Sequence, residues 1–313
     1  MIKGNALKEK GYNGIYAVGR GAEFPPMLLT LVFKNENDKK NKEHKNNKNI
    51  ALVGKGLIYD CGGLSLKPSA NMCNMKTDMG GSAAVLCGFL LIVEQCLSFS
   101  NNNHLNFNFE NLSVTLCLAE NAIDSKSYKN DDIIIMKSGK SVEIRNTDAE
   151  GRLCLGDGVF HATSGNKNKN NKINFIPDIL IDMATLTGAQ GVATGTHHSS
   201  IYCNDANTTE IFVKSGKKSG DVNFPVLYCP EFHVMTYASP VADLRNINNG
   251  GPDASVSLGG FFVEENINSE IYKNEKNENN LIFVHVDLAF PSFDESGATG
   301  YGVSLLNEYI LHA

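Results

Sequence analysis

The hydrophobic residues of this chain fall mainly into short continuous runs and a few longer apolar stretches. A short apolar run without polar alternation is typical of a strand that is buried on both faces. Four runs have this form and are predicted to be strands: residues 50–53, 112–118, 179–182 and 282–288. Two longer stretches, residues 80–96 and 302–311, are predicted to be helices. Strands and helices that alternate in this way predict an α/β fold.

Turn residues refine this pattern at three places. The strand at residues 50–53 is expected to end at the turn Gly54-Lys55-Gly56, and residues 184–188 are expected to open a helix. Residues 133–136 and 141–144 flank a short turn with a glycine and predict a β-hairpin. We therefore expect a mixed, mostly parallel central sheet with helices on both faces. In such sheets ligands bind at the carboxyl ends of the strands, where most polar motifs of this chain fall.

Four polar tracts interrupt the globular pattern. All are rich in asparagine, most also in lysine, and they comprise residues 34–49, 101–111, 165–174 and 268–280. They carry too few apolar residues to offset the entropy of ordering them, so we predict surface insertions that are mobile or disordered. The alternative, basic arms that bind nucleic acid, is disfavoured because the chain has a net charge of −6 and acidic residues are interleaved in the longer tracts.

Composition narrows the class of protein. Of the 313 residues, 42% are hydrophobic and 20% are charged, which is typical of a soluble globular enzyme. The longest apolar run, residues 83–93, is shorter than the roughly 18–20 residues of a membrane span. The first residues lack the apolar core of a secretory signal, so we expect a cytoplasmic protein with no membrane partner. The 8 cysteines form no CxxC pair and are expected to be reduced thiols.

The candidate chemistry lies in acidic residues near a lysine and an arginine. Asp148 and Glu150 are two residues apart, and Arg152 follows two residues later, between an extended run and an apolar one. Together with Asp60 and Asp78 they place four carboxylates in motifs that follow predicted strands or turns. Four clustered carboxylates would repel one another without counter-ions, and two divalent cations would balance them. The alternative is a set of unrelated surface acids, some of them helix caps.

Long motifs carry a family resemblance. They are VGKGLIYDCGG at 53–63, KP at 67–68, MKTDMGG at 75–81, NTDAEGRL at 146–153 and DMATLTGA at 182–189. With these motifs the chain resembles the leucyl aminopeptidase (M17-type) family of two-metal exopeptidases, from about residue 14 to the last helix. The resemblance implies a zinc-exopeptidase-like fold, with residues 1–313 as one catalytic domain, and a homohexamer. Family members usually carry a further N-terminal domain, and residues 229–249 look closer to the divergent probable-aminopeptidase-like branch.

The resemblance also implies the metal ligands. One divalent ion would be held by Lys55, Asp60, Asp78 and Glu150, and a second, more exchangeable ion by Asp60, Asp148 and Glu150. The donor set suits Zn²⁺, Mn²⁺, Co²⁺ or Mg²⁺. An ammonium cannot coordinate a metal, so Lys55 would bind as a neutral amine, which burial and two neighbouring dications favour. The alternative is a lysine that contacts phosphate or solvent.

The resemblance assigns further roles to a lysine and an arginine. Lys67 would stay charged and stabilise the oxyanion of the tetrahedral intermediate. Arg152 would hold a bicarbonate ion that acts as a general base. The alternative for Arg152 is a salt bridge to Asp148 or Glu150.

Four residues match substrate-binding positions of the family: Met75, Thr185, Leu186 and Gly188. They imply a preference for apolar first residues such as Leu or Met, although Met75 could instead fill a gap in the core. The function implied is hydrolysis of the N-terminal peptide bond of short peptides with a free amino terminus, by a water or hydroxide that bridges two metals. The alternatives are a catalytically inactive structural or regulatory family member and a specialised dipeptidase that acts, for example, on Cys-Gly.

Overall fold

A central sheet of eight strands organises the computed structural model, which describes residues 1–35, 48–98, 107–165, 173–248, 253–272 and 281–312. In spatial order its strands are β1 (Ile2–Lys3), β2 (Met27–Lys34), β4 (Phe109–Asn121), β3 (Lys48–Asp60), β7 (Ile179–Ala184), β11 (Ile282–Asp287), β8 (Ser199–Cys203) and β9 (Asn223–Pro225). The central pairings β4–β3, β3–β7 and β7–β11 are parallel, as is β8–β9, and the other three are antiparallel. The predicted mixed, mostly parallel sheet is confirmed.

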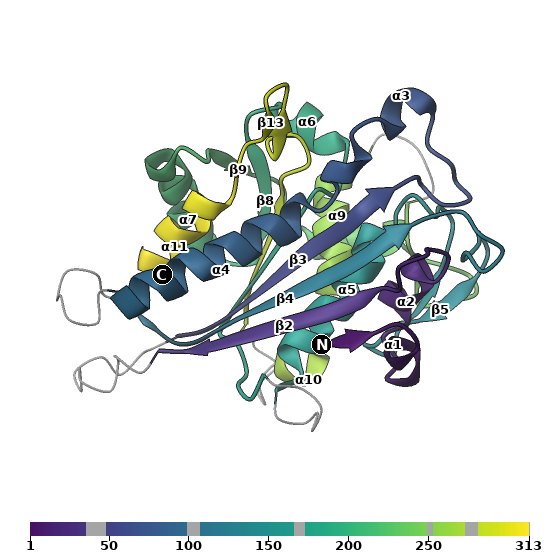
Figure 1. The fold of residues 1–313 in the computed structure, drawn as a ribbon, viewed down its shortest axis with the longest axis horizontal. Coiled ribbons are helices and arrows are strands. Elements are labelled where there is room, and N and C mark those ends of the chain that lie inside the picture. Colours follow the sequence, from purple (N-terminus) through teal and green to yellow (C-terminus); the bar gives the residue numbers. More distant parts are fainter. Residues whose placement is uncertain (36–47, 99–106, 166–172, 249–252, 273–280, 313) are drawn as a thin grey trace.

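Helices cover both faces of this sheet (Figure 1). One layer contains α4 (Gly80–Ser98), α7 (Ala206–Ser219) and α11 (Val303–His312), and the other contains α1 (Asn5–Glu9), α2 (Asn13–Gly19), α5 (Gly151–Thr163) and α9 (Ser255–Glu264). Neighbouring residues of β3 point into different cores: Leu52 packs with the α4 layer and Val53 with the α5 layer. Because side chains alternate along a strand, a strand covered on both sides is apolar at every position.

Shorter elements complete the fold. They are α3 (Ser69–Met72), η2 (Met75–Thr77), α6 (Ala189–Thr194), α8 (Pro230–Thr236), α10 (Ser269–Tyr272), β5 (Ile133–Ile135), β6 (Ser141–Glu143), β10 (Leu244–Arg245), β12 (Phe293–Asp294) and β13 (Gly297–Ala298). The predicted hairpin is confirmed, since β5 and β6 pair antiparallel with Ile134 opposite Val142. The helices predicted at residues 80–96 and 302–311 are confirmed as α4 and α11.

The turn predicted at Gly54-Lys55-Gly56 is wrong, because β3 continues through it to Asp60. A Cβ atom on Gly54 would lie 2.6 Å from the Cα atom of Ser82, and one on Gly56 would lie 2.5 Å from the Ser82 hydroxyl oxygen. Ser82 belongs to the first turn of α4. The glycines therefore let the start of α4 approach the strand closely, and Lys55 between them lies inside the strand.

The boundaries predicted for the polar tracts are partly wrong. Residues 36–47, 101–106, 166–172 and 273–280, which make up much of these tracts, lie outside the described residues. The edges of the first two tracts belong to the sheet: Lys34 of β2 pairs with Asn111 of β4, and Lys48 of β3 pairs with Phe109. Backbone hydrogen bonds to neighbouring strands extend the sheet into these polar residues, although their composition alone predicts that they lie outside it.

One helical segment, residues 69–98, has the length and apolar composition of a membrane span. In the structure its main part, α4, packs against the sheet, with Val85, Phe89 and Ile92 buried in the core. A helix that packs on a sheet in a protein core can have the same apolar composition as a membrane span.

Candidate metal centre and active site

The candidate site lies at the carboxyl ends of neighbouring parallel strands. Asp60 is the last residue of β3, Asn121 is the last residue of β4, and Thr185 directly follows β7. Because these strands are adjacent and parallel, their ends share one edge of the sheet. The sequence motifs that are far apart along the chain meet at this edge.

Three carboxylates form the centre of the site. Asp60, Asp148 and Glu150 each offer an oxygen, and these oxygens lie within 4.8 Å of one another. Asp60 and Glu150 are buried, and Asp148 is half-buried. Asp78 joins them through Lys55, whose Nζ lies 2.8 Å from Asp78 Oδ1 and 3.0 Å from Glu150 Oε1. The structure thus brings all five predicted ligands together.

Lys55 is held by three separate parts of the chain. Besides its two carboxylate partners, Nζ donates a hydrogen bond to the backbone carbonyl of Thr185 at 2.8 Å. The Thr185 hydroxyl donates to Asp78 Oδ1 at 2.8 Å. Glu150 precedes α5, whose first residue is Gly151, and a Cβ atom there would lie 2.6 Å from Lys55 Cε. The glycine after Glu150 is therefore required for Lys55 to pass under the start of the helix.

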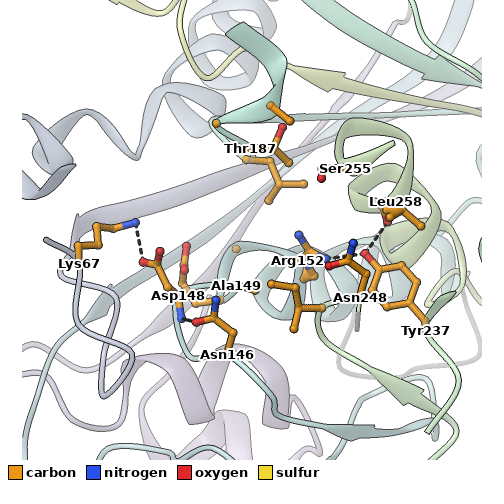
Figure 2. Close-up of a pocket in the computed structure, with 16 residues that line it drawn as sticks. Lys67, Asn146, Asp148, Ala149, Arg152, Thr187, Tyr237, Asn248, Ser255 and Leu258 are labelled. Carbon is orange, nitrogen blue, oxygen red and sulfur yellow. Dashed lines mark hydrogen bonds and ion pairs between the residues drawn. The ribbon is translucent and has the colours of Figure 1, made fainter. Parts of the chain in front are cut away.

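Lys67 forms a second bridge between carboxylates. Its Nζ lies 2.8 Å from Asp60 Oδ2 and 2.5 Å from Asp148 Oδ1. Figure 2 shows it reaching Asp148 from the loop that follows β3. Burial alone lowers the pKa of Lys67, but Asp60 and Asp148 raise that pKa well above its usual range. Lys67 is therefore a charged group beside the predicted ligands.

Two further residues organise the site, and the motifs did not single them out. Asn121 donates from Nδ2 to Asp60 Oδ1 at 2.8 Å and to the carbonyl of Thr147 at 3.1 Å. Asp287 accepts hydrogen bonds from the backbone N–H of Thr187 at 3.1 Å and from the Thr187 hydroxyl at 2.6 Å. Asn121 and Asp287 are the last residues of β4 and β11, so the carboxyl-end rule offers a signal for both.

Burial dominates the electrostatics of the cluster. Burial and the charge of Asp60 raise the pKa of Glu150 to about 8, although Lys55 opposes the shift. Burial also raises the pKa of Asp78 to about 6, again against Lys55. Burial alone would lower the pKa of Lys55, but Asp78, Glu150 and Asp60 raise it well above its usual range. With only protein groups around it, Lys55 is an ammonium. It can become the neutral amine expected of a metal ligand only when divalent cations bind beside it.

The donor set fits divalent cations. Asp78 Oδ2 and Glu150 Oε2 are buried and have no hydrogen-bond partner among the described residues. Buried carboxylate oxygens without a partner are costly, and a cation would satisfy them. Among the described residues these four carboxylates share two ammonium groups, and carboxylate oxygens with one amine nitrogen suit Zn²⁺, Mn²⁺, Co²⁺ and Mg²⁺.

A cavity of about 300 Å³ opens beside the carboxylates (Figure 2). It is lined by Lys67, Asn146, Asp148, Ala149, Glu150, Gly151, Arg152, Leu186, Thr187, Gly188, Ala189, Tyr237, Ile247, Asn248, Ser255 and Leu258. Of the predicted substrate-binding residues, Leu186 and Gly188 line it. Met75 and Thr185 are not among the lining residues: Met75 is half-buried in η2, and Thr185 is bonded to Asp78 and Lys55.

Arg152 lies in the first turn of α5 and reaches this cavity. Its Nη1 donates to the hydroxyl of Tyr237 at 2.5 Å. Among the described residues, neither Asp148 nor Glu150 forms an ion pair with Arg152. The alternative role for Arg152, a salt bridge to one of them, is therefore not seen in this part of the chain.

A mixed sheet covered by helices, with a lysine and four carboxylates gathered near its carboxyl edge, defines an α/β protein with a candidate metal centre. The model of the cytosol aminopeptidase family, catalytic domain, matches residues 1–307, and the chain belongs to this family. The resemblance to leucyl aminopeptidases inferred from the motifs is confirmed.

Relatives agree with this assignment. The Probable aminopeptidase NPEPL1 of Mus musculus is 40% identical over 306 residues, which are 98% of this chain and 52% of the relative. The Leucine aminopeptidase 1 of Caenorhabditis elegans is 37% identical over 308 residues, 98% of this chain and 55% of the relative. A structure of leucyl aminopeptidase from Leishmania major in complex with actinonin has a TM-score of 0.89 and 52% identity, and covers 100% of this chain and 54% of that one. The chain spans about half the length of the curated relatives it matches.

Proposed function

We propose that residues 1–313 form the catalytic domain of a two-metal aminopeptidase, which hydrolyses the N-terminal peptide bond of short peptides. The observation that carries the proposal is the cluster of Lys55, Asp60, Asp78, Asp148 and Glu150, with two buried oxygens unpartnered among the described residues. Membership of the cytosol aminopeptidase family and relatives named aminopeptidases support it.

The proposed ligand sets are those that the family resemblance implies, and the clustering of these residues supports them. Lys55, Asp60, Asp78 and Glu150 would hold one divalent ion, and Asp60, Asp148 and Glu150 would hold the other. Bound Zn²⁺, Mn²⁺, Co²⁺ or Mg²⁺ would polarise the peptide carbonyl and generate a nucleophile from water at neutral pH. The distances of 2.8 and 3.0 Å from Lys55 to Asp78 and Glu150 support its place in the first set.

Lys67 and Arg152 supply positive charge beside the carboxylates. Both line the cavity, and the raised pKa of Lys67 keeps its ammonium charged. We assign Lys67 to hydrogen bonding with the developing oxyanion, where a preorganised cation lowers the barrier. We assign Arg152 to holding a bicarbonate ion that takes and returns the proton as a general base.

The first residue of the substrate would contact the wall formed by Leu186 and Gly188. At Gly188 a Cβ atom would meet nothing within 4 Å, so this wall leaves space for an apolar side chain such as that of Leu or Met. Met75 and Thr185 stay in the proposal as substrate-binding residues on the family resemblance alone, because neither lines the described cavity. Relatives named "Probable cytosol aminopeptidase" support a cytosolic location. Assembly as a homohexamer remains part of the proposal.

The test is hydrolysis of leucine amide by the 313-residue chain, with and without added Mn²⁺, Co²⁺ or Zn²⁺. We expect metal-dependent turnover, and we expect Glu150→Ala to lose both bound metal, measured by mass spectrometry, and activity. The matched control is Glu210→Ala, which changes an exposed glutamate of α7 that pairs with Lys214. Full turnover by Glu150→Ala would overturn the mechanism.

The same assay separates the alternatives. Turnover of Cys-Gly without turnover of leucine amide would indicate a specialised dipeptidase. A folded, metal-loaded chain that hydrolyses neither leucine amide nor a panel of dipeptides would indicate a structural or regulatory family member.

A further inference from the structure

Tyr237 connects Arg152 to helix α9. The tyrosine directly follows α8, is fully buried and lies 85 positions from Arg152 in the sequence. Its hydroxyl accepts a hydrogen bond from Arg152 Nη1 at 2.5 Å and donates one to the carbonyl of Leu258, in α9, at 2.9 Å. Figure 2 shows the chain of contacts from the arginine through the phenol to the helix. The hydroxyl thus uses both its donor and its acceptor capacity.

The ring of Tyr237 is fixed by the same helix. Phe261 stacks on it with ring centroids 6.0 Å apart and an interplanar angle of 14°. Phe262 meets it edge-on, with centroids 5.8 Å apart and an angle of 65°. Both phenylalanines are buried in α9. Because ring and hydroxyl are both anchored to one helix, the phenol oxygen has a fixed position at the cavity wall.

This contact determines how the guanidinium of Arg152 is oriented. Within the described ranges Tyr237 is the only hydrogen-bond partner of the Arg152 side chain, and the buried Arg152 Nε has none. The guanidinium carbon also lies 5.9 Å from the centre of the Tyr237 ring. A guanidinium is a rigid fork of five N–H donors, so fixing one nitrogen and the plane directs the others. Arg152 lines the cavity, so the other Nη donors of its guanidinium are left for a ligand there.

We propose that Tyr237 is the positioning residue of Arg152: it orients the guanidinium toward the cavity without neutralising it. A carboxylate in the same place would form an ion pair and compete with any anion for the guanidinium. A phenol accepts one hydrogen bond and leaves the full positive charge available. This inference rests on the proposed function, because that function gives Arg152 its part in proton transfer.

The substitution Tyr237→Phe removes the hydroxyl and retains the ring packing on α9. We expect a roughly tenfold to hundredfold lower kcat for leucine amide, as for the loss of a hydrogen bond to a charged group. The KM is expected to change little, because the carboxylates, Leu186 and Gly188 remain in place. A purely structural role would lower stability without this split between kcat and KM.

The experiment is a double-mutant cycle with Tyr237→Phe, Arg152→Ala and the double variant. We expect Tyr237→Phe to cause no further loss of kcat once Arg152 is alanine, and independent, multiplicative losses would overturn the proposal. The control is Tyr202→Phe, which removes another buried hydroxyl, bonded to Glu264 Oε2 at 2.7 Å and outside the cavity lining. It should retain the wild-type kcat.

A second readout does not require turnover. In a chain labelled with ¹⁵N-arginine, the Nε–H signal of Arg152 is identified by its absence from Arg152→Ala. We expect this signal to be resolved and slow to exchange with solvent in the wild type and in Tyr202→Phe, and to merge with exposed arginine signals in Tyr237→Phe. An unchanged signal in Tyr237→Phe would overturn the proposal. If the wild type hydrolyses no substrate, the proposed function fails, while this spectrum still decides whether Tyr237 fixes Arg152.

Discussion

The substitution Gly151→Ala tests whether the metal centre depends on the close approach of α5 to Lys55. A Cβ atom at position 151 would lie 2.6 Å from Lys55 Cε, 2.8 Å from Cδ and 2.9 Å from Nζ. Ordinary contacts between such atoms begin near 3.4 Å. Lys55 cannot simply swing away, since Asp78, Glu150 and the carbonyl of Thr185 hold its amine in a buried site. The methyl group must therefore displace the lysine or the start of the helix.

Two opposing effects decide the magnitude. Alanine is favoured over glycine in a helix by at most about 1 kcal/mol, and less at the first helical position. In the metal-free chain, where Lys55 is an ammonium, displacing one partner of a buried ion pair costs about 3–5 kcal/mol. The second effect wins, so we expect the free energy of unfolding to fall by roughly 2–4 kcal/mol. A ligand misplaced by about 1 Å lowers turnover by about 100-fold, so metal content and activity should fall as well.

The assay compares Gly151→Ala with Gly188→Ala. Gly188 also lies at the start of a helix, α6, but a Cβ atom there would meet nothing within 4 Å. Urea unfolding and metal content should therefore match the wild type in Gly188→Ala and change in Gly151→Ala. If Gly151→Ala bound both metals and unfolded at the wild-type urea concentration, the reasoning about Lys55 would be refuted.

Two further predictions concern a supporting residue and a buried acid. Asn121→Ala removes the amide that donates to Asp60 Oδ1 at 2.8 Å, and we expect roughly 10–100-fold weaker metal binding by titration, whereas wild-type affinity would contradict this. Burial raises the pKa of Asp157 to about 7 from 3.8, against backbone donors at Lys137 and Ile15. The folded state thus binds the Asp157 proton more tightly than the unfolded state does. The stability that the protonated carboxyl contributes is therefore complete below pH 4 and is lost as the pH rises towards 7, by up to about 4 kcal/mol. Urea unfolding at pH 5 and 7.5 should show this loss in the wild type and not in Asp157→Asn. If the free energy of unfolding changed equally with pH in both proteins, the buried Asp157 carboxyl would not be its cause.

The sequence predicted the elements whose physical signal is local. Strands β4, β7 and β11 and helix α4 are buried against both layers or a broad sheet face, so their apolar runs are continuous. Strand β2 was not predicted, although Met27–Lys34 is apolar at six of its eight positions; in the structure only one of these residues, Leu28, is fully buried. Helix α5 was not predicted either: Gly156 and Gly158 lower its helix propensity, and packing against β3 and α9 outweighs that preference.

The ligand candidates were also accessible from sequence, since the long motifs around Asp60, Asp78, Asp148 and Glu150 carry the family resemblance that implies them. The reason for Gly54 and Gly56 was not accessible. A turn and a close contact with α4 both require glycine, and only the packed structure distinguishes them. The same holds for Met75, which matches a substrate-binding motif but does not line the described cavity.

By itself the sequence determined which chemical groups this protein can bring to one sheet edge, because residue type and position after a buried strand are local properties. The tertiary structure decided which side chains form hydrogen bonds with one another. Asn121 reaches Asp60 because β4 lies parallel to β3, and Tyr237 reaches Arg152 because α9 anchors its ring. These hydrogen bonds, 2.5 to 2.9 Å long, depend on strand order and helix packing. Neither can be read from a stretch of neighbouring residues in the sequence.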